Sequence, residues 1–528
     1  MGRLTCMDII QYSFRNYNRN WRFSAYPVDL PEDVCYNQSQ KRFIPRKRII
    51  LQKEKNAMIP LPQPIRKLIL PEYMVKPSQK LGDDYPAGEM YRNFVRIAWP
   101  ALMESVLIGL VSFVDSVMVS TVGETAVAAV GLTNQPRLLF YAIFLSLSIA
   151  VNAMVSRRFG EKNQEGANRC LAMVLPLAFG LCAVFTVIAF AVSRPLLLFA
   201  GAQEDTIELA IPYFRICMVG MNFTVISLII NAAQRGCGNT RISMTTNLSA
   251  NAVNVVFNAI LINGLLFFPK MGVIGAAVAT MLGNIASAII SIRSVCIKDR
   301  FLRLRLSDMT KWDFDQLKTV FSIGSGSLVE QIFMRIGFFS YAKLVAELGT
   351  MEFATHQIVM SIITLSFTVG DGLGTASSAL VGQNLGRKRP DMSIIYGRIG
   401  QRFGACISVL LVLIFTFAGG FLVRLFSDDP EVIRVGRILL YIVAVTAPFQ
   451  VSQVISRGCL NGAGDTRYTA LVSFVSIALV RPVLTYILCY PMGLGVYGAW
   501  ISLLIDQVTR FGFTMFRYRG DQWYKKKV

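Results

Sequence analysis

Residues 97–122 read IAWPALMESVLIGLVSFVDSVMVSTV, an apolar run of the length that an α-helix needs to cross the hydrocarbon core of a bilayer. Two carboxylates, Glu104 and Asp115, interrupt this run. An ionised carboxylate at the bilayer centre costs about 2.5–3.5 kcal/mol on insertion scales, so an acid kept there needs a compensating role. Apolar residues continue after Asp115 as far as Gly123, which favours a helical position over a loop. Asp115 is therefore the first functional candidate.

The composition is typical of a polytopic helical membrane protein. Of the 528 residues, 53% are hydrophobic and 16% charged, and the mean hydropathy is +0.49. Such a chain is too apolar for a soluble enzyme and too long for a single anchor. The net charge of +21 would suit a nucleic-acid binder, but the basic residues lie between apolar segments. We therefore expect a lipid bilayer as the environment and no nucleic-acid partner.

Motifs for metal, redox or enzyme chemistry are missing from the sequence. The ten cysteines are scattered without CxxC or CxxCH spacing, which indicates neither a disulfide framework nor a metal site. The sequence also has no HExxH, GxSxG or P-loop signature. We therefore expect no cofactor and no enzymatic activity.

Residues 1–92 differ from the rest of the chain because they are polar and rich in Arg, Lys and Pro. They hold 16 Lys or Arg against 9 Asp or Glu and lack the apolar core of a signal peptide. A basic segment of this kind can bind anionic lipid. We favour instead a basic, disordered N-terminal extension, or a translation start at Met58 or Met90.

From residue 93 onward, twelve apolar segments are separated by connections that alternate between strongly and weakly basic. The positive-inside rule places the basic connections in the cytoplasm, so an even number of spans puts both termini there. This predicts a multi-pass protein of the cell membrane with a basic cytoplasmic tail at 518–528. The segments lie near residues 93–121, 131–155, 171–192, 207–232, 243–264, 273–296, 317–346, 354–380, 402–423, 435–456, 469–490 and 495–517.

The second half of the chain repeats the first. A shift of 226 residues aligns Glu104 with Glu330 and GCGNTR at 236–241 with GAGDTR at 462–467. This duplication predicts two six-helix lobes, 93–296 and 317–517, joined by a cytoplasmic linker at 297–316. Because six is even, both lobes share one orientation, and their pseudo-two-fold axis runs along the membrane normal, as in transporters. A cavity between such lobes can open to either side.

Polar residues present in one half only are candidates for a site, because a fold-maintaining role would be needed in both halves. Asp115 aligns with Tyr341, and Asp371 aligns with Leu145. The remaining residues of this kind are Asn254, Asn258 and Thr280, which align with Val480, Leu484 and Leu503.

Asn254 and Asn258 lie one helical turn apart and can present two amide oxygens on one face. Together with the Thr280 hydroxyl and the Asp115 carboxylate they form a set of hard oxygen donors, which suits Na⁺. A lone desolvated carboxylate suits H⁺ instead. Hydrogen bonding between helices is the structural alternative for the Asn pair. The residues themselves leave the choice between the two ions open.

The second half offers Glu330, Asp371 and Arg481 as candidates for substrate or proton binding. The structural alternative for Glu330 is an ion pair with Arg335, and that for Asp371, which stands between two glycines, is a hinge. Arg481 is expected either to partner an acid from another helix or to coordinate an anionic substrate. His356, the only histidine, is expected to be a helix cap or a structural donor.

At these residues the chain resembles the multidrug and toxic compound extrusion (MATE) family. The resemblance covers about residues 93–517 and rests on DSVMVSTVGETAVAAVGL from residue 115, GCGNTR, GVIGAAVAT, LVGQNLGRKRPD and GAGDTR. It implies twelve helices in two lobes and export of organic cations or other amphipathic small molecules, driven by H⁺ or Na⁺. We expect such a protein to act as a monomer.

The resemblance assigns Asp115 to the family's first-helix acid, and Asn254 and Thr280 to its N-lobe cation site. Asn258 departs from the pattern because many members have an aspartate there, and the tenth segment lacks the acid found in some branches. A site with one anion attracts Na⁺ less strongly, but it also loses the like-charge repulsion that would favour protonation of Asp115. We lean towards H⁺, because a single desolvated carboxylate is enough to carry a proton.

Two other transport functions, those of a flippase and of a channel, are alternatives to ion-coupled export. A flippase for lipid-linked precursors or polysaccharides, from the same wider superfamily, would line its cavity with several cationic residues. Here Arg137, Arg335 and Arg481 accompany four acids, so this alternative stays open. A channel would not require two duplicated lobes.

Overall fold

The computed structural model describes residues 34–37, 42–45, 70–82, 85–120, 124–200, 204–264, 269–297, 300–304 and 313–526. Side chains are described from residue 70 onward, apart from those at 110, 112–117, 119–120, 124–128, 135, 204–205, 263 and 365. Contacts divide the chain into two units, residues 1–69 and 70–528. In the first unit the described residues form an antiparallel hairpin of β1 (Val34–Asn37) and β2 (Arg42–Pro45).

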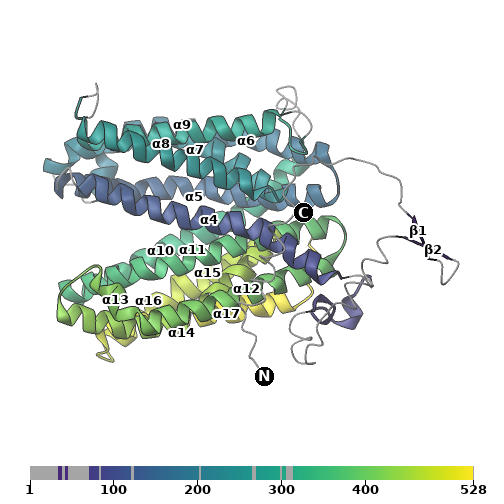
Figure 1. The fold of residues 1–528 in the computed structure, drawn as a ribbon. Helices are drawn as coiled ribbons and strands as arrows, with labels where there is room; N and C mark the ends of the chain where they lie inside the picture. The colour runs from purple at the N-terminus through teal and green to yellow at the C-terminus, as the bar shows by residue number, and fades with distance from the viewer. Residues whose placement is uncertain are drawn as a thin grey trace. The chain divides into compact units, whose positions relative to one another are not determined.

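The described part of residues 70–528 is helical, and each of the twelve apolar segments corresponds to one helical rod (Figure 1). Eight described helices are long and apolar enough to cross a membrane by length and composition alone. The N-lobe consists of α4 (Ala87–Ser120), α5 (Glu124–Gly160), α6 (Gln164–Phe199), α7 (Glu204–Gly236), α8 (Thr240–Asn263) and α9 (Gly272–Cys296). The C-lobe consists of α10 (Phe314–Ala346), α11 (Thr350–Gly386), α12 (Pro390–Phe417) with α13 (Gly419–Arg424), α14 (Pro430–Gly462), α15 (Thr466–Ser473) continuing through a π-helical stretch (Phe474–Val480) into α16 (Arg481–Cys489), and α17 (Gly495–Arg519).

The ends of several helices follow local capping signals. The side chain of Asn163 accepts a hydrogen bond from the Gly166 amide at 2.8 Å at the start of α6, and Asp313 caps α10 in the same way. Proline occupies the first position of α12 and α14, where its missing N–H costs no hydrogen bond. Gly264 ends α8 with φ +72°, a left-handed conformation that a residue without a Cβ adopts freely.

The duplication inferred from the sequence is visible in the backbone and in the packing. Lys162 and Lys388, which are equivalent by the 226-residue shift, both have φ +58°. Equivalent helices also form equivalent contacts, since α5 packs on α7 as α11 packs on α14, and α4 packs on α8 as α10 packs on α15. The two halves therefore share one fold and one orientation, as the even number of helices per repeat predicted.

The lobes meet around a pseudo-two-fold axis between α5 and α11. Asn152 and Ser378 are equivalent residues, and the Asn152 amide donates a hydrogen bond to Ser378 Oγ at 3.1 Å. Gly160 lies against the carbonyl of Gln383 and Gly386 lies against the carbonyl of Arg157, which is the same contact made twice. A Cβ at either glycine would collide with the opposing backbone, so these glycines allow the close approach.

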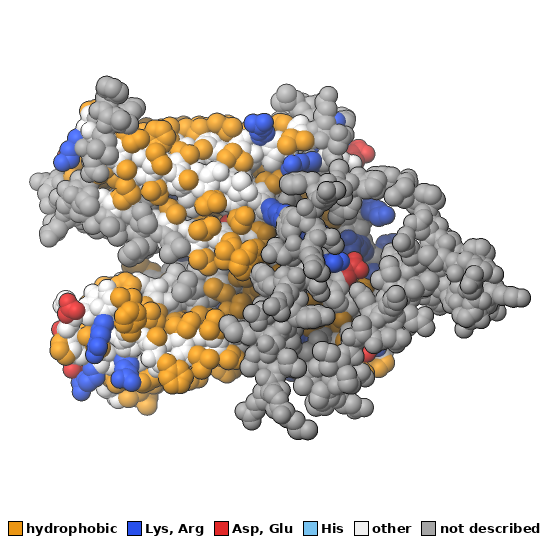
Figure 2. Space-filling model, viewed as in Figure 1, with side chains coloured by type: hydrophobic (Ala, Val, Ile, Leu, Met, Phe, Trp, Pro, Cys, Tyr) orange, Lys and Arg blue, Asp and Glu red, His pale blue; other side chains and the backbone are white. Residues whose placement is uncertain are grey.

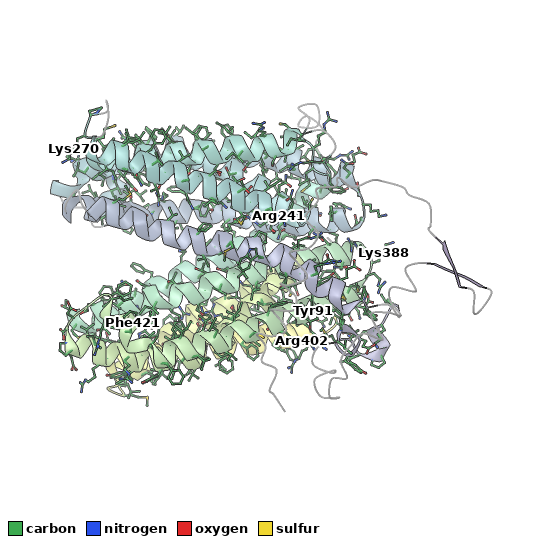
Figure 3. All side chains as sticks on the ribbon, viewed as in Figure 1. Tyr91, Arg241, Lys270, Lys388, Arg402 and Phe421 are labelled. Atoms are coloured by element: carbon green, nitrogen blue, oxygen red, sulfur yellow. The ribbon has the colours of Figure 1, made fainter. Side chains whose placement is uncertain are left out.

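The lobes approach each other at one end and diverge towards the other. We call the end that carries the turns at 160–163, 236–239, 386–389 and 462–465 the basic end. Lys388 lies there, whereas Lys270 and Phe421 lie at the opposite end (Figure 3). Figure 2 shows apolar side chains over both lobes and a hollow between the lobes towards the opposite end. The space between the lobes is therefore closed at the basic end.

The structure corrects the expected extent of the N-terminal extension. Residues 70–80 form two short 3-10 helices, Pro71–Tyr73 and Pro77–Gln79, and α4 already begins at Ala87 rather than near 93. Met74 is fully buried in the same apolar cluster as residues of α11, α12 and α14. The Tyr85 hydroxyl donates to Asp391 at 2.9 Å, and burial together with this bond raises the pKa of Tyr85. The described residues 70–82 and 85–86 thus pack on the C-lobe, while residues 1–69 lie outside the described side chains.

Residues 521–526, within the predicted basic tail, also pack at the basic end. Trp523 is fully buried, and Gln79 donates a hydrogen bond to Asp521 at 2.8 Å. Arg157 of the N-lobe donates two hydrogen bonds of 3.0 Å to the carbonyl of Lys526. Arg402 on α12 also donates a hydrogen bond to the Tyr91 hydroxyl on α4 at 3.0 Å (Figure 3). At the basic end, the lobes are therefore in contact through the first helix, α4, and through the residues that follow the last helix, α17.

Candidate functional site

The N-lobe holds a chain of neutral polar side chains between α8 and α9. The Asn258 amide donates a hydrogen bond to the Asn254 side-chain oxygen at 3.2 Å, and the Asn254 amide donates to Thr280 Oγ1 at 3.1 Å. Both asparagines are buried. The structure therefore brings together three of the four residues that the sequence proposes for cation coupling. A cation held by these oxygens would have to replace bonds that the side chains make to one another.

Asp115, the fourth residue of that set, lies in α4, and its side chain is outside the described residues. Helix α4 packs against both α8 and α9, which carry the other three residues. The backbone of α4 is thus next to the polar chain. The contribution of the Asp115 carboxylate to it remains a prediction.

Glu104, the N-lobe member of the pair of acids that the halves share, is held by three polar side chains. It accepts hydrogen bonds from Ser243 Oγ at 2.8 Å and from Asn247 at 2.6 Å. Arg235 of α7 lies 3.7 Å from the same carboxylate oxygen and donates to Ser243 at 2.8 Å. Glu104 therefore forms an ion pair that links α4 to α7, and the Ser243 hydroxyl of α8 bonds to both of its members.

Glu330, the C-lobe member, is also held by a hydroxyl and an arginine, but the arginine comes from one helical turn earlier, since Arg457 aligns with Asn231 and Arg235 aligns with Asn461. Thr469 of α15, which aligns with Ser243, donates a hydrogen bond to Glu330 Oε2 at 2.8 Å. Arg457 of α14 lies 3.4 Å from Glu330 Oε1. The expected ion pair with Arg335 is wrong, because Arg457 reaches this carboxylate from another helix. A role shared by both lobes is structural by the reasoning applied to the sequence, so this contact fastens α10 to α14 and α15.

Asp371 adds a second carboxylate to the C-lobe contact. Its Oδ1 accepts a hydrogen bond from Arg457 Nη2 at 3.1 Å, so Arg457 bridges Glu330 and Asp371. The Asp371 side chain is 55% exposed, whereas that of Glu330 is 2% exposed. The neighbouring Gly372 lies against Leu102 of α4, which places Asp371 beside a contact between the lobes. Of the two C-lobe acids, Asp371 is the accessible one.

Arg481 is fully buried within the C-lobe and pairs with an acid from another helix, one of the two roles expected for it. Arg481 Nε lies 3.1 Å from Asp506 Oδ2 on α17, and Arg510 Nη2 lies 2.9 Å from the same oxygen. The guanidinium of Arg481 also stacks over the rings of Phe338 and Tyr341. All three charged side chains are buried, so this cluster does not line an open cavity.

His356 is not a helix cap, since it lies in the second turn of α11 and is buried. Its ring packs against those of Tyr341, Phe353 and Trp500, with centroids 5.3, 6.2 and 5.5 Å away. Its position indicates a packing role.

Sequence reasoning missed Arg457, Asp506 and Arg510. Arg457 stands five residues before the GAGDTR turn and reads as part of a basic connection, so only the structure turns it towards Glu330. The ion pair between Asp506 and Arg510 could have been predicted from the sequence. The two residues are spaced i, i+4 within the apolar last segment, a spacing at which opposite charges meet on one helix face.

The comparison with protein families matches both halves of the chain to one model. The MatE family model matches residues 100–260 and again residues 327–487. The chain therefore belongs to the MatE family, as the resemblance in the sequence indicated. The two separate matches also agree with the duplication that the backbone shows.

Relatives and solved structures agree with this assignment. The chain is 26% identical over 453 residues to the probable multidrug resistance protein NorM of Thermotoga maritima, covering 83% of this chain and 94% of that one. It is 24% identical to the uncharacterized transporter YisQ of Bacillus subtilis, covering 84% and 96%. The fold matches an outward-facing MATE family transporter of the MOP superfamily with a TM-score of 0.76, 22% identity and coverage of 83% and 99%. A MOP superfamily transporter from Pyrococcus furiosus, described as having a binding pocket of reverse polarity, matches with a TM-score of 0.75, 22% identity and coverage of 81% and 95%. These matches confirm the twelve-helix, two-lobe fold.

Proposed function

We propose that the protein is a secondary active antiporter that exports organic cations or amphipathic drugs and metabolites in exchange for H⁺ or Na⁺. The observation that carries this proposal is the pair of equivalent lobes, which meet around the α5–α11 contact and diverge towards the opposite end. Two lobes related in this way can rock about their contact, so that the space between them opens to one side at a time. Membership of the MatE family and the names of the relatives support multidrug export.

The basic end is assigned to the cytoplasm. Helix α4 begins there and α17 ends there, and the turns carry the basic residues Lys162, Lys388 and Arg389. The positive-inside rule places such turns in the cytoplasm. In this orientation the lobes close the cytoplasmic side and the space between them is open to the outside of the cell membrane.

Coupling is assigned to Asp115 with the polar chain of Asn254, Asn258 and Thr280. Of the described bonds among these three residues, the one between Asn254 and Thr280 joins two helices and the one between Asn258 and Asn254 lies within α8. An interhelical bond of this kind contributes on the order of 0.6 kcal/mol in measured membrane proteins, so a cation can replace it at low cost. We favour H⁺ because Asn258 adds no second anion to the site.

Flipping of lipid-linked precursors is less well supported. That function calls for several cationic side chains free to bind a phosphate. Of the three arginines named for it, Arg481 is paired with Asp506, and Arg137 donates to Asn134 and Cys217.

Counterflow in proteoliposomes tests the proposal. Vesicles loaded with tetraphenylphosphonium should exchange it for external label, and Asp115→Asn should abolish efflux driven by an ion gradient while the protein remains inserted. Gradients of H⁺ and Na⁺ imposed one at a time identify the coupling ion. Wild-type efflux from a folded Asp115→Asn variant contradicts the site, and efflux driven by Na⁺ alone contradicts H⁺ coupling.

A further inference from the structure

Arg457 is paired with Asp371, the accessible carboxylate to which a cationic substrate could bind. We propose that Arg457 is a displaceable counter-ion, which pairs with Asp371 when no substrate is bound and yields Asp371 to an organic cation. This inference rests on the proposed function, because it concerns the substrate class named there. It adds a specificity-determining residue, Arg457, to the C-lobe.

The two ends of the Arg457 guanidinium are held very differently. Nη1 lies 3.4 Å from Glu330, whose other oxygen accepts the 2.8 Å bond from Thr469. Nη2 lies 3.1 Å from Asp371, whose side chain is more than half exposed. A buried ion pair is costly to break because it leaves an uncompensated charge, whereas an exposed pair contributes little. Loss of Arg457 would therefore leave a buried charge at Glu330, whereas Asp371, although its bond to Nη2 is the shorter of the two, has a half-exposed carboxylate that another cation can reach.

The charge of this cluster favours a second cation. Glu330, Asp371 and Arg457 together carry two negative charges and one positive charge when all are ionised. A monovalent organic cation next to Asp371 neutralises the cluster, and Arg457 keeps its anchor on Glu330 meanwhile. Because Gly370 and Gly372 flank Asp371, no side chain on either side in the sequence shields the carboxylate.

The N-lobe provides a matched comparison. Arg235, Glu104 and Ser243 form a similar ion pair, with Arg235 one helical turn beyond the position that aligns with Arg457, and the residue aligned with Asp371 is Leu145. Arg235 therefore has no carboxylate at the position of Asp371 that it could release to a substrate. If Arg457 acts through Asp371, substitution of Arg235 should not have the same effect.

Equilibrium binding to the purified full-length protein tests the proposal with two probes of the same shape and opposite charge, tetraphenylphosphonium and tetraphenylborate. Arg457→Gln should tighten tetraphenylphosphonium binding roughly fivefold and weaken tetraphenylborate binding, because an exposed charge pair is worth up to about 1 kcal/mol. Asp371→Asn should weaken tetraphenylphosphonium binding, and Arg457→Gln should then bring no tightening. Arg235→Gln should leave both affinities within twofold of wild type.

A variant that leaves Glu330 buried without its partner can unfold, so the double variant Glu330→Gln with Arg457→Gln serves as the second test. It removes the buried charge together with its partner and should still bind tetraphenylphosphonium more tightly. Unchanged or weaker binding by this folded double variant, or an equal gain in Arg235→Gln, overturns the proposal. Counterflow by the wild type separates the two ideas: binding changes without transport refute the antiporter, and transport without binding changes refutes the role of Arg457.

Discussion

The contact between the fifth and sixth helices differs between the lobes more than any other part of the duplicated fold described above. In the N-lobe, α8 and α9 are joined by a neutral bond from Asn254 to Thr280, and Asn258 donates to Asn254 within α8. In the C-lobe, α16 and α17 are joined by buried charges, with Asp506 between Arg481 and Arg510. The same helix pair is thus fastened weakly in one lobe and strongly in the other.

This difference indicates a division of labour between two copies of one fold. Neutral hydrogen bonds inside a membrane protein contribute little, so an ion can rearrange them. A buried ion pair cannot be opened from one side without leaving an unpaired charge. The N-lobe contact is therefore suited to exchange a ligand, and the C-lobe contact is suited to hold its helices in place.

The largest expected effect is at the charged contact. Asp506→Asn leaves Arg481 and Arg510 without a counter-charge and should lower the free energy of unfolding by about 3–5 kcal/mol. Thermal unfolding in detergent measures this loss. Replacing all three members of the cluster, with Arg481→Met, Asp506→Leu and Arg510→Met, should recover part of the stability. A loss below about 1 kcal/mol for Asp506→Asn would mean that the C-lobe contact is no stronger than its N-lobe counterpart.

The next effect concerns the segments that lead into the first helix of each lobe. Met74, before α4, is buried on the C-lobe, and Leu302, before α10, is buried on the N-lobe. A chain that starts at Met90 loses Met74 and should lose about 2 kcal/mol from that side chain alone, because burial of a Met contributes about 1.5–3 kcal/mol.

A chain that starts at Leu70 is the control for this truncation and should keep wild-type thermal stability and counterflow. A disordered extension, or a translation start at Met90, as the sequence suggested, would make the residues before Met90 dispensable. Equal stability of the two truncated chains would support that prediction against the packing of residues 70–86.

An effect of similar size, equal in the two lobes, is expected at the two hydroxyls that hold the shared glutamates. Ser243→Ala and Thr469→Val each remove a 2.8 Å hydrogen bond to a carboxylate, and each should cost about 1.5–3 kcal/mol if the carboxylate stays charged. Parallel unfolding measurements on the two variants compare the lobes directly. A marked difference between them would show that the equivalent glutamates do not have equivalent roles.

The smallest effect on stability is expected in the N-lobe chain. Thr280→Val removes the acceptor of the Asn254 bond and should cost on the order of 0.6 kcal/mol, measured by the same unfolding assay. Its effect on coupling should be larger than its effect on stability. Asn258→Asp should strengthen the dependence of efflux on Na⁺, and an unchanged dependence would argue against an ion at this chain.

Much of the fold could be predicted from the sequence, because the signals involved are local or repeat along the chain. Apolar runs gave twelve helices, and the 226-residue shift gave two lobes in one orientation. The neutral site was also within reach, since Asn254 and Asn258 are one turn apart and Thr280 lies on the next helix. The pairing of Glu330 with Arg457 could not be predicted, because Arg335 is the nearer candidate along the chain.

The sequence by itself determined where helices form, how many there are and that one half copies the other, because hydrophobic length and internal similarity are properties of a one-dimensional pattern. Only the tertiary structure decided which charges meet. Arg457 reaches Glu330 across 127 residues of chain, and Arg481 reaches Asp506 on the next helix. Inside a membrane an ionised side chain must find an opposite charge wherever the packing of helices brings one close. The same packing, and not the polar composition of residues 70–86, decides that this segment is part of the C-lobe.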